Sequence, residues 1–240
     1  MANNYFQLKE FTVQQDRCAM RVSTDACIFG AHVANRIASA RPTIYRVLDI
    51  GTGTGLLSLM VAQKSAAMVL GIEIDKDAFE QAKENFAGSV WQDRLSVIHT
   101  DAVSFDSEHA YDAIISNPPF YAGDLQSGDS KKNAAKHDTT LTLEALLSSI
   151  DRNLSPQGFF ALLLPPRRVD YFIDIAKNKG YSLDSKLSIR HGAALPFHRC
   201  TLYFSRQYVE PVFDELSIKN TAGDYTPAFT SLLKDYYLYL

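Results

Sequence analysis

Short apolar runs alternate with stretches of helical periodicity through the first three quarters of the chain. Five runs have the length and composition of buried strands: 46–51, 68–75, 95–101, 111–116 and 159–164. Four stretches instead carry apolar residues at helical spacing: 56–63, 78–86, 143–154 and 169–176. Strands that alternate with helices of this length predict an α/β fold with a mostly parallel, doubly wound sheet.

The pattern changes after residue 181. Residues 183–191 and 200–208 alternate polar with apolar side chains, and only a short segment with glycine and proline connects them. This spacing favours a β-hairpin over a crossover, so the sheet is expected to end in an antiparallel C-terminal hairpin. The last stretch, 226–240, is expected to be helical and apolar enough to pack against the body.

Composition narrows the class of protein without deciding the function. Apolar residues make up 46% of the chain and the formal net charge is −3, so no overall basic field attracts nucleic acid, although a local basic patch remains possible. The three cysteines form no paired motif, which argues against a disulfide framework or a zinc site. The start shows no signal-peptide pattern and no apolar run is long enough to span a membrane, so a cytoplasmic location is expected.

A glycine-rich loop, Asp49-Ile-Gly-Thr-Gly-Thr-Gly55, follows the first strand and opens the first helix. Glycines let the chain turn sharply and let a ligand approach the backbone closely. The dinucleotide motif requires a third glycine where this chain has Leu56, and no nucleoside-triphosphate loop is present. The spacing therefore disfavours NAD and FAD.

Two acidic residues stand at the ends of the next two strands. Glu73 is placed to accept hydrogen bonds from both hydroxyls of a ribose, and Asp101 from the amino group of an adenine. Carboxyl ends of neighbouring parallel strands share one edge of the sheet, so the loop and both carboxylates predict a crevice for an adenosine without phosphates. The alternative makes Glu73 a helix-capping residue and Asp101 a turn residue.

An asparagine and two prolines follow the fourth strand, in the sequence Asn117-Pro118-Pro119-Phe120. Together with the glycine loop, Glu73 and Asp101, this motif resembles the class I, Rossmann-like S-adenosylmethionine-dependent methyltransferases. Its form is similar to that of enzymes that methylate planar nitrogens, namely adenine N6, the guanine amino group or the glutamine amide.

The chemistry of a planar amine explains these residue types. Its lone pair is delocalised, so it is a poor nucleophile, and the Asn117 amide oxygen and the Pro118 carbonyl can accept its two hydrogens. These hydrogen bonds favour the transition state over the ground state. Pro118 and Pro119 stiffen the corner, and Phe120 or Tyr121 can stack on the target, worth ~1–3 kcal/mol per base. The reaction requires no metal.

The resemblance also implies which residues hold the cofactor, S-adenosylmethionine, whose product is S-adenosylhomocysteine. A Thr-Asp pair at the start of a leading helix, with a nearby arginine, is implied at the methionine end. The full set of implied cofactor contacts is Arg21, Thr24, Asp25, Asp49, Gly51, Thr52, Gly53, Gly55, Glu73, Ile74, Asp101, Ala102 and Asn117. Taken alone, Asp25 could simply cap a helix that starts near Ala26.

The whole pattern most resembles the bacterial tRNA1(Val) adenine-N6 methyltransferase family. Matching motifs run nearly end to end, from Asp-Arg-Cys-Ala-Met near the start to the closing Tyr-Tyr-Leu, with departures at Ser23 and Ala26. This resemblance implies direct methyl transfer to the exocyclic amine of adenine 37, beside the anticodon. It implies a single domain over 1–240, with a cofactor-covering segment at 1–45 and a C-terminal extension at 210–240 packed on the body.

Binding a tRNA requires contacts to phosphates and bases. The candidate contacts, grouped near strand ends, are Tyr121, Lys131, Lys132, Lys136, Arg167, Arg168, His198 and Arg199. Taken singly, each of these charges is more simply explained as a solvated surface residue. An anticodon-loop base is already poorly paired, so its extrusion costs less than the few kcal/mol required in a duplex.

Three alternatives stay open. A glutamine methyltransferase of a release factor shares the motif but usually has a helical N-terminal domain, for which the 45 residues before the first strand leave no room. A ribosomal RNA guanine-N2 methyltransferase often has a duplicated domain, for which the chain shows no sign. A cofactor-binding scaffold that has lost catalysis is disfavoured, because Asn117, Asp101 and Glu73 are all intact. No obligate protein partner is evident.

Overall fold

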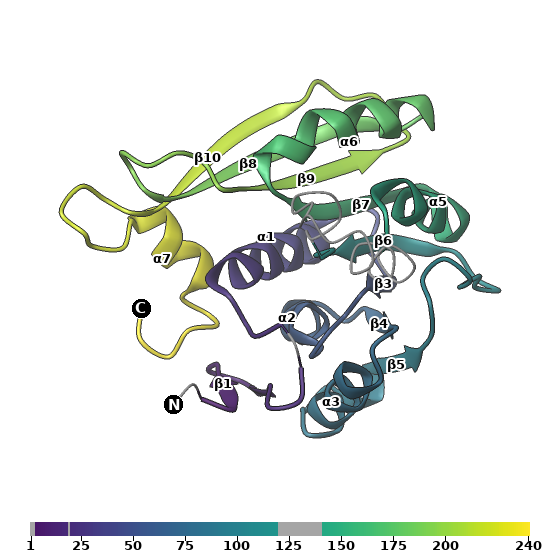
Figure 1. Ribbon diagram of the computed structural model, residues 1–240, viewed down its shortest axis with the longest axis horizontal. Coiled ribbons are helices and arrows are strands. Elements are labelled where there is room, and N and C mark those ends of the chain that lie inside the picture. Colours follow the sequence, from purple (N-terminus) through teal and green to yellow (C-terminus); the bar gives the residue numbers. More distant parts are fainter. Residues whose placement is uncertain (1–2, 19, 120–140) are drawn as a thin grey trace, which may run out of the picture.

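The computed structural model describes residues 3–18, 20–119 and 141–240, and it is built around an eight-stranded sheet (Figure 1). The strand order is β10-β8-β9-β7-β6-β3-β4-β5. The five strands from β7 to β5 run parallel to one another: β3 (Arg46–Ile50), β4 (Met68–Glu73), β5 (Leu95–His99), β6 (Tyr111–Ser116) and β7 (Leu154–Leu164). All five predicted parallel strands are confirmed.

The other end of the sheet is mixed. β8 (Ser182–Gly192) and β9 (Arg199–Ser205) form the predicted antiparallel hairpin, and β9 inserts between β8 and β7. The edge strand β10 (Val212–Lys219) was not expected from the sequence, because charged residues interrupt its pattern and only Leu216 and Ile218 are buried. Residues 210–240 therefore begin with a strand of the sheet itself.

Helices cover both faces of the sheet, in two separate apolar clusters. One face carries α1 (Thr24–Ser39), α2 (Leu56–Lys64), α3 (Lys76–Ala87) and α7 (Pro227–Leu233), and the other carries α5 (Leu143–Asn153) and α6 (Pro166–Asn178). A short 3-10 turn, η1 (Gln92–Arg94), precedes β5. Residues 234–240 are not helical, so the expected C-terminal helix is correct only for its first half. No helix within the described ranges is long and apolar enough to cross a membrane.

The start of α1 corrects one expectation. Ser23 is the N-cap, and its hydroxyl accepts a hydrogen bond from the Ala26 amide at 3.2 Å. Asp25 lies within the first turn, so it does not cap the helix. Its carboxylate is left available for other contacts.

The N-terminal segment precedes the first strand of the eight-stranded sheet and packs on the helical layer. β1 (Tyr5–Gln7) and β2 (Thr12–Gln14) form a small antiparallel pair, and β2 lies against α3. The Lys9 amide donates to the Tyr236 carbonyl at 2.8 Å, and the Tyr236 hydroxyl donates to the Met60 carbonyl at 3.0 Å. Both ends of the chain are thus tied to the same face of the molecule.

Candidate functional site

A cavity of about 420 Å³ opens at the carboxyl ends of the parallel strands. Its volume falls in the range of small-molecule sites, about 300–1,000 Å³. Its walls come from the loops after β3, β4, β5 and β6, from the N-terminal residues 18 and 20–23, and from the first turns of α1, α2, α3 and α5. This is the edge at which the sequence predicts an adenosine crevice.

The glycine loop forms one wall. Gly51 and Gly53 have φ angles of 70° and 58°, and a Cβ added to either would meet no described atom within 4 Å. Both glycines line the cavity, so this loop leaves open space where a ligand can approach the backbone. Gly55 is different, because a Cβ there would lie 2.4 Å from Phe86 and the residue does not line the cavity. Its absent side chain serves packing against α3.

Glu73 holds the loop from the end of β4. Its carboxylate accepts hydrogen bonds from the backbone amides of Gly53 (2.9 Å), Ile74 (3.0 Å) and Asp75 (2.9 Å). The helix cap of α3 is Asp75, so the alternative that Glu73 caps the helix is wrong. A carboxylate has about four lone-pair sites, so Glu73 retains capacity to accept from a ligand hydroxyl.

Asp101 is exposed near the start of the loop after β5 and lines the cavity. One of its oxygens accepts from the Val103 amide at 2.8 Å, so the residue does occupy a turn, as the alternative predicts. Turn geometry and ligand contact are compatible here, because the turn uses a single acceptor. Ile74, Ala102 and Val103 add apolar wall beside it.

Asn117 lies directly after β6 and lines the cavity. Its amide oxygen Oδ1 is buried and has no hydrogen-bond partner among the described residues. A buried polar atom without a partner is costly and needs an explanation, such as a ligand donor. Pro118 is buried and Pro119 is exposed at the cavity wall. Phe120 lies outside the described residues.

Asp49 lies behind the loop and not on the cavity wall. Its Oδ2 accepts from the hydroxyls of Thr52 (2.7 Å) and Ser58 (2.8 Å), and Thr52 does line the cavity. Burial raises the pKa of Asp49 to about 6, although the two hydroxyl hydrogen bonds oppose that shift. Asp49, which the resemblance implies as a cofactor contact, therefore holds the glycine loop from behind.

The three residues implied at the methionine end of the cofactor do not all line the cavity. Arg21 lines the cavity, whereas Thr24 and Asp25 do not. Asp25 Oδ1 lies 2.8 Å from His198 Nε2 and its Oδ2 lies 3.7 Å from Arg199 Nε, so the carboxylate ties the start of α1 to the β8–β9 connection. Asp25 thus contacts both His198 and Arg199. The roles of these three residues toward the cofactor or RNA remain predictions.

The other predicted RNA contacts divide into two groups. Tyr121, Lys131, Lys132 and Lys136 lie outside the described residues. Arg167 and Arg168 occupy the first turn of α6, after the carboxyl end of β7, and so lie at the same sheet edge as the cavity.

Several wall residues escape sequence reasoning. Cys18, Met20, Leu141 and Thr142 line the cavity but carry no chemical signature. Burial raises the pKa of the Cys18 thiol, so nothing marks this residue as a nucleophile. Thr142 is the exception, because a threonine directly before a helix is a recognisable N-cap. In the structure it caps α5 by accepting from the Ala145 amide at 3.1 Å.

Comparisons with known proteins agree with this geometry. The family described as "Methyltransferase small domain" matches residues 31–155. A protein of Dyadobacter fermentans named tRNA1(Val) (adenine(37)-N6)-methyltransferase is 43% identical, over 98% of each chain. A protein of the same name in Phocaeicola vulgatus is 38% identical, over 99% of each. A crystal structure of a predicted O-methyltransferase from Agrobacterium tumefaciens superposes with a TM-score of 0.67 at 16% identity, covering 88% of this chain and 96% of that chain, which shows a shared fold.

Proposed function

The chain belongs to the tRNA1(Val) (adenine(37)-N6)-methyltransferase family, and we propose that it methylates N6 of adenine 37 in tRNA1(Val) with S-adenosylmethionine as the methyl donor. The observation that carries the proposal is Asn117, whose buried amide oxygen has no described partner and lies on the wall of the cavity.

The described residues fit this cofactor. Open space beside Gly51 and Gly53 suits a ligand laid against the backbone. Glu73 would accept the ribose hydroxyls, Asp101 the adenine amino group, and Arg21 would contact the methionine end. S-adenosylmethionine supplies, when bound, a methyl group activated by a positively charged sulfur.

The chain's own contribution to the reaction is orientation of the target amine. The Asn117 Oδ1 and the Pro118 carbonyl accept the two amino hydrogens, which fixes the nitrogen in one plane. As the nitrogen becomes more positive in the transition state, both hydrogen bonds strengthen, and this difference in binding lowers the barrier. The amine is neutral before the transfer, so its surplus proton can leave to water afterwards and no strong general base is required.

The tRNA must deliver an unstacked base to Asn117 and Pro118. Extruding a base from an anticodon loop costs less than the few kcal/mol needed in a duplex. Arg167 and Arg168 lie at the same sheet edge as the cavity and are the proposed phosphate contacts within the described residues.

The test incubates the purified chain with cofactor labelled in its methyl group and, separately, with unmodified tRNA, ribosomal RNA and a release factor. The expected result is label in tRNA alone, recovered as N6-methyladenosine after digestion to nucleosides. Label recovered as methylguanosine in ribosomal RNA, or as methylglutamine in the release factor, would overturn the proposal.

A further inference from the structure

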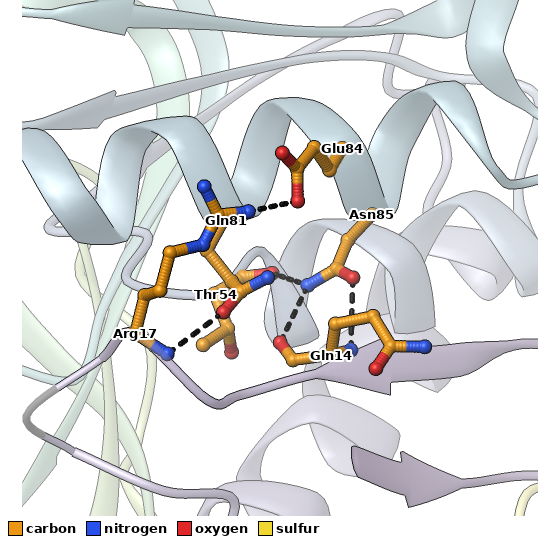
Figure 2. A network of polar contacts seen from close by, with 6 residues as sticks. All are labelled: Gln14, Arg17, Thr54, Gln81, Glu84 and Asn85. Atoms are coloured by element: carbon orange, nitrogen blue, oxygen red, sulfur yellow. Dashed lines mark hydrogen bonds and ion pairs between the residues drawn. The ribbon is translucent and has the colours of Figure 1, made fainter. Parts of the chain in front are cut away.

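Helix α3 buries two side-chain amides that the reaction does not explain. Gln81 is 1% exposed and Asn85 is 4% exposed, and they lie one turn apart on the face that meets the N-terminal segment (Figure 2). Buried amides are costly unless they are hydrogen-bonded, so their partners indicate what the site is built to hold.

Asn85 joins two segments that are far apart in the chain. Its Oδ1 accepts from the Gln14 amide at 2.9 Å, and its Nδ2 donates to the Gln14 carbonyl at 3.0 Å and to the Thr54 carbonyl at 2.8 Å (Figure 2). Gln14 belongs to β2, and Thr54 belongs to the glycine loop of the cavity. An amide is suited to this position, because it combines one acceptor with two donors.

Gln81 holds the next part of the N-terminal segment. Its Oε1 accepts from the Arg17 backbone amide at 3.1 Å. The Arg17 guanidinium pairs with Glu84 on the same helix, but these side chains are 40% and 55% exposed (Figure 2). An exposed pair of this kind contributes little. Leu8, Phe11 and Val13 anchor the segment in the apolar core, and the two buried amides add the polar contacts that set its register on α3.

The docked segment leads directly into the cavity wall. Cys18, Met20, Arg21, Val22 and Ser23 line the cavity. The Val22 amide donates to Gln15 Oε1 at 2.9 Å, which holds Val22 close to the end of β2. Fixing Gln14 and Arg17 on α3 therefore fixes the position of this wall relative to the glycine loop.

We propose that Asn85 and Gln81 are positioning residues for cofactor binding, which hold the N-terminal segment over the cavity in register with the glycine loop. The inference rests on the cofactor part of the proposed function and is independent of the tRNA. Without Asn85, only a fraction of molecules has the wall in place, and the apparent affinity for S-adenosylmethionine falls by that fraction.

The test measures S-adenosylmethionine binding calorimetrically for Asn85→Ala, without tRNA. The dissociation constant is expected to rise ~10-fold, while the turnover rate at saturating cofactor stays within about twofold of wild type. Asn85→Asp keeps the acceptor for Gln14 but loses both donors, so it should be impaired to a similar degree. Glu84→Gln, on the same helix, should bind the cofactor as wild type does.

A matched control separates positioning from general destabilisation. Asp184 is buried and accepts from Arg36 (2.9 Å) and Ser205 (2.9 Å) near the start of β8, at the sheet edge opposite the cavity. Asp184→Asn should lower the unfolding temperature without changing cofactor affinity. If Asn85→Ala behaves like Asp184→Asn, destabilised but with wild-type affinity, the inference is wrong.

The single tryptophan of the chain supplies a second readout. Trp91 packs against Phe11 of the N-terminal segment, with ring centroids 5.7 Å apart. Quenching of Trp91 fluorescence by acrylamide should increase in Asn85→Ala and return toward the wild-type value at saturating cofactor. Quenching that is unchanged in Asn85→Ala would also contradict the inference.

Two further outcomes are distinguishable. If Asn85→Ala does not fold, Gln81→Ala serves as the test variant instead. It removes a single contact to Arg17, and its affinity for the cofactor is expected to fall about threefold.

A wild-type chain that binds no S-adenosylmethionine would overturn both proposals, whereas one that binds the cofactor but leaves tRNA unmethylated would overturn only the proposed function.

Discussion

The two walls of the cavity are held in place by different means. The strand-end wall, with Gly53, Glu73 and Asn117, is fixed by the backbone ladder of the sheet and by the hydrogen bond from the Gly53 amide to Glu73. The N-terminal wall, made of residues 18 and 20–23, follows a segment that is anchored by buried apolar side chains, and its register is set by side chains of α3 and by the cap of α1. A sheet ladder depends on many backbone hydrogen bonds, whereas a wall whose register is set by a few amides can be shifted by one substitution.

This difference separates the expected effects of substitutions. Changes in the strand-end wall should alter chemistry or direct ligand contacts while the N-terminal segment stays docked. Changes at Asn85 or Gln81 should undock the segment while the chemistry stays intact. Trp91 quenching distinguishes the two cases, because Trp91 packs against Phe11 of the segment and does not line the cavity.

The largest effect is expected at Asn117. Asn117→Ala removes an acceptor for the target amine, and turnover should fall at least ~100-fold, as when a transition-state hydrogen bond is removed elsewhere. The cofactor dissociation constant should stay within about threefold and Trp91 quenching should not change. Near-wild-type turnover would show that Asn117 does not orient the amine.

The next largest effect is expected at Glu73, where substitution by alanine should weaken cofactor binding. It removes the proposed ribose acceptor and frees three backbone amides, including that of Gly53. Since hydrogen bonds to charged groups contribute more than neutral ones, a ~100-fold rise in the dissociation constant is expected by calorimetry. A change of less than threefold would place the ribose elsewhere.

Gly53→Ala should have an intermediate effect, and the chain offers a matched control. Gly53 and Gly223 both have positive φ angles, 58° and 91°, and a Cβ at either meets no described atom within 4 Å. Each alanine should therefore cost similar backbone strain, about 1–2 kcal/mol. Only Gly53→Ala should also weaken cofactor binding, by about tenfold, because only Gly53 lines the cavity. Equal affinities in the two variants would mean that no ligand approaches Gly53.

The smallest effect is expected for Asp49, which lies behind the strand-end wall, and it concerns the stability of the fold. Burial raises the pKa of Asp49 to about 6, so the folded state binds this proton more tightly than the unfolded chain does. Its contribution to the free energy of unfolding is therefore greatest below about pH 4 and declines as the pH rises to about 6.

Urea denaturation of Asp49→Asn between pH 4 and pH 7 checks this dependence. The asparagine oxygen can still accept from Thr52 and Ser58, so the loop should keep its shape. The variant should lack the decline between pH 4 and pH 6 that wild type shows. Parallel pH profiles would mean that Asp49 does not titrate in this range.

The strand-end wall could be predicted from the sequence pattern, whereas for the N-terminal wall the resemblance implied only a covering segment at 1–45 and the contact of Arg21, which lines the cavity. Alternation of apolar runs with helices predicts parallel strands, and the carboxyl ends of parallel strands share one edge of the sheet, which places Glu73, Asp101 and Asn117 along that edge. Gln81 and Asn85 adjoin the apolar stripe of α3 at Ala82 and Phe86, but an amide near a stripe does not reveal its partner. That partner lies about 70 residues away, as the contact between Asn85 and Gln14 shows.

The missed edge strand has a different physical cause. β10 buries Leu216 and Ile218 on one side, while Phe213 and Glu215 on the other remain exposed. An edge strand with one partner needs few apolar residues, so its alternation is weak. The same reasoning explains why β1 and β2, of three residues each, were not expected.

Mapping of the methylated position tests the central claim most directly. Unmodified tRNA1(Val) transcripts with adenine or guanine at position 37 are incubated with the protein and S-adenosylmethionine, and the fragments are analysed by mass spectrometry. The account predicts one methyl group per adenine-37 transcript, located on N6 of that base, and none on the guanine-37 transcript. Methylation of both transcripts, or of a different nucleotide, would contradict it.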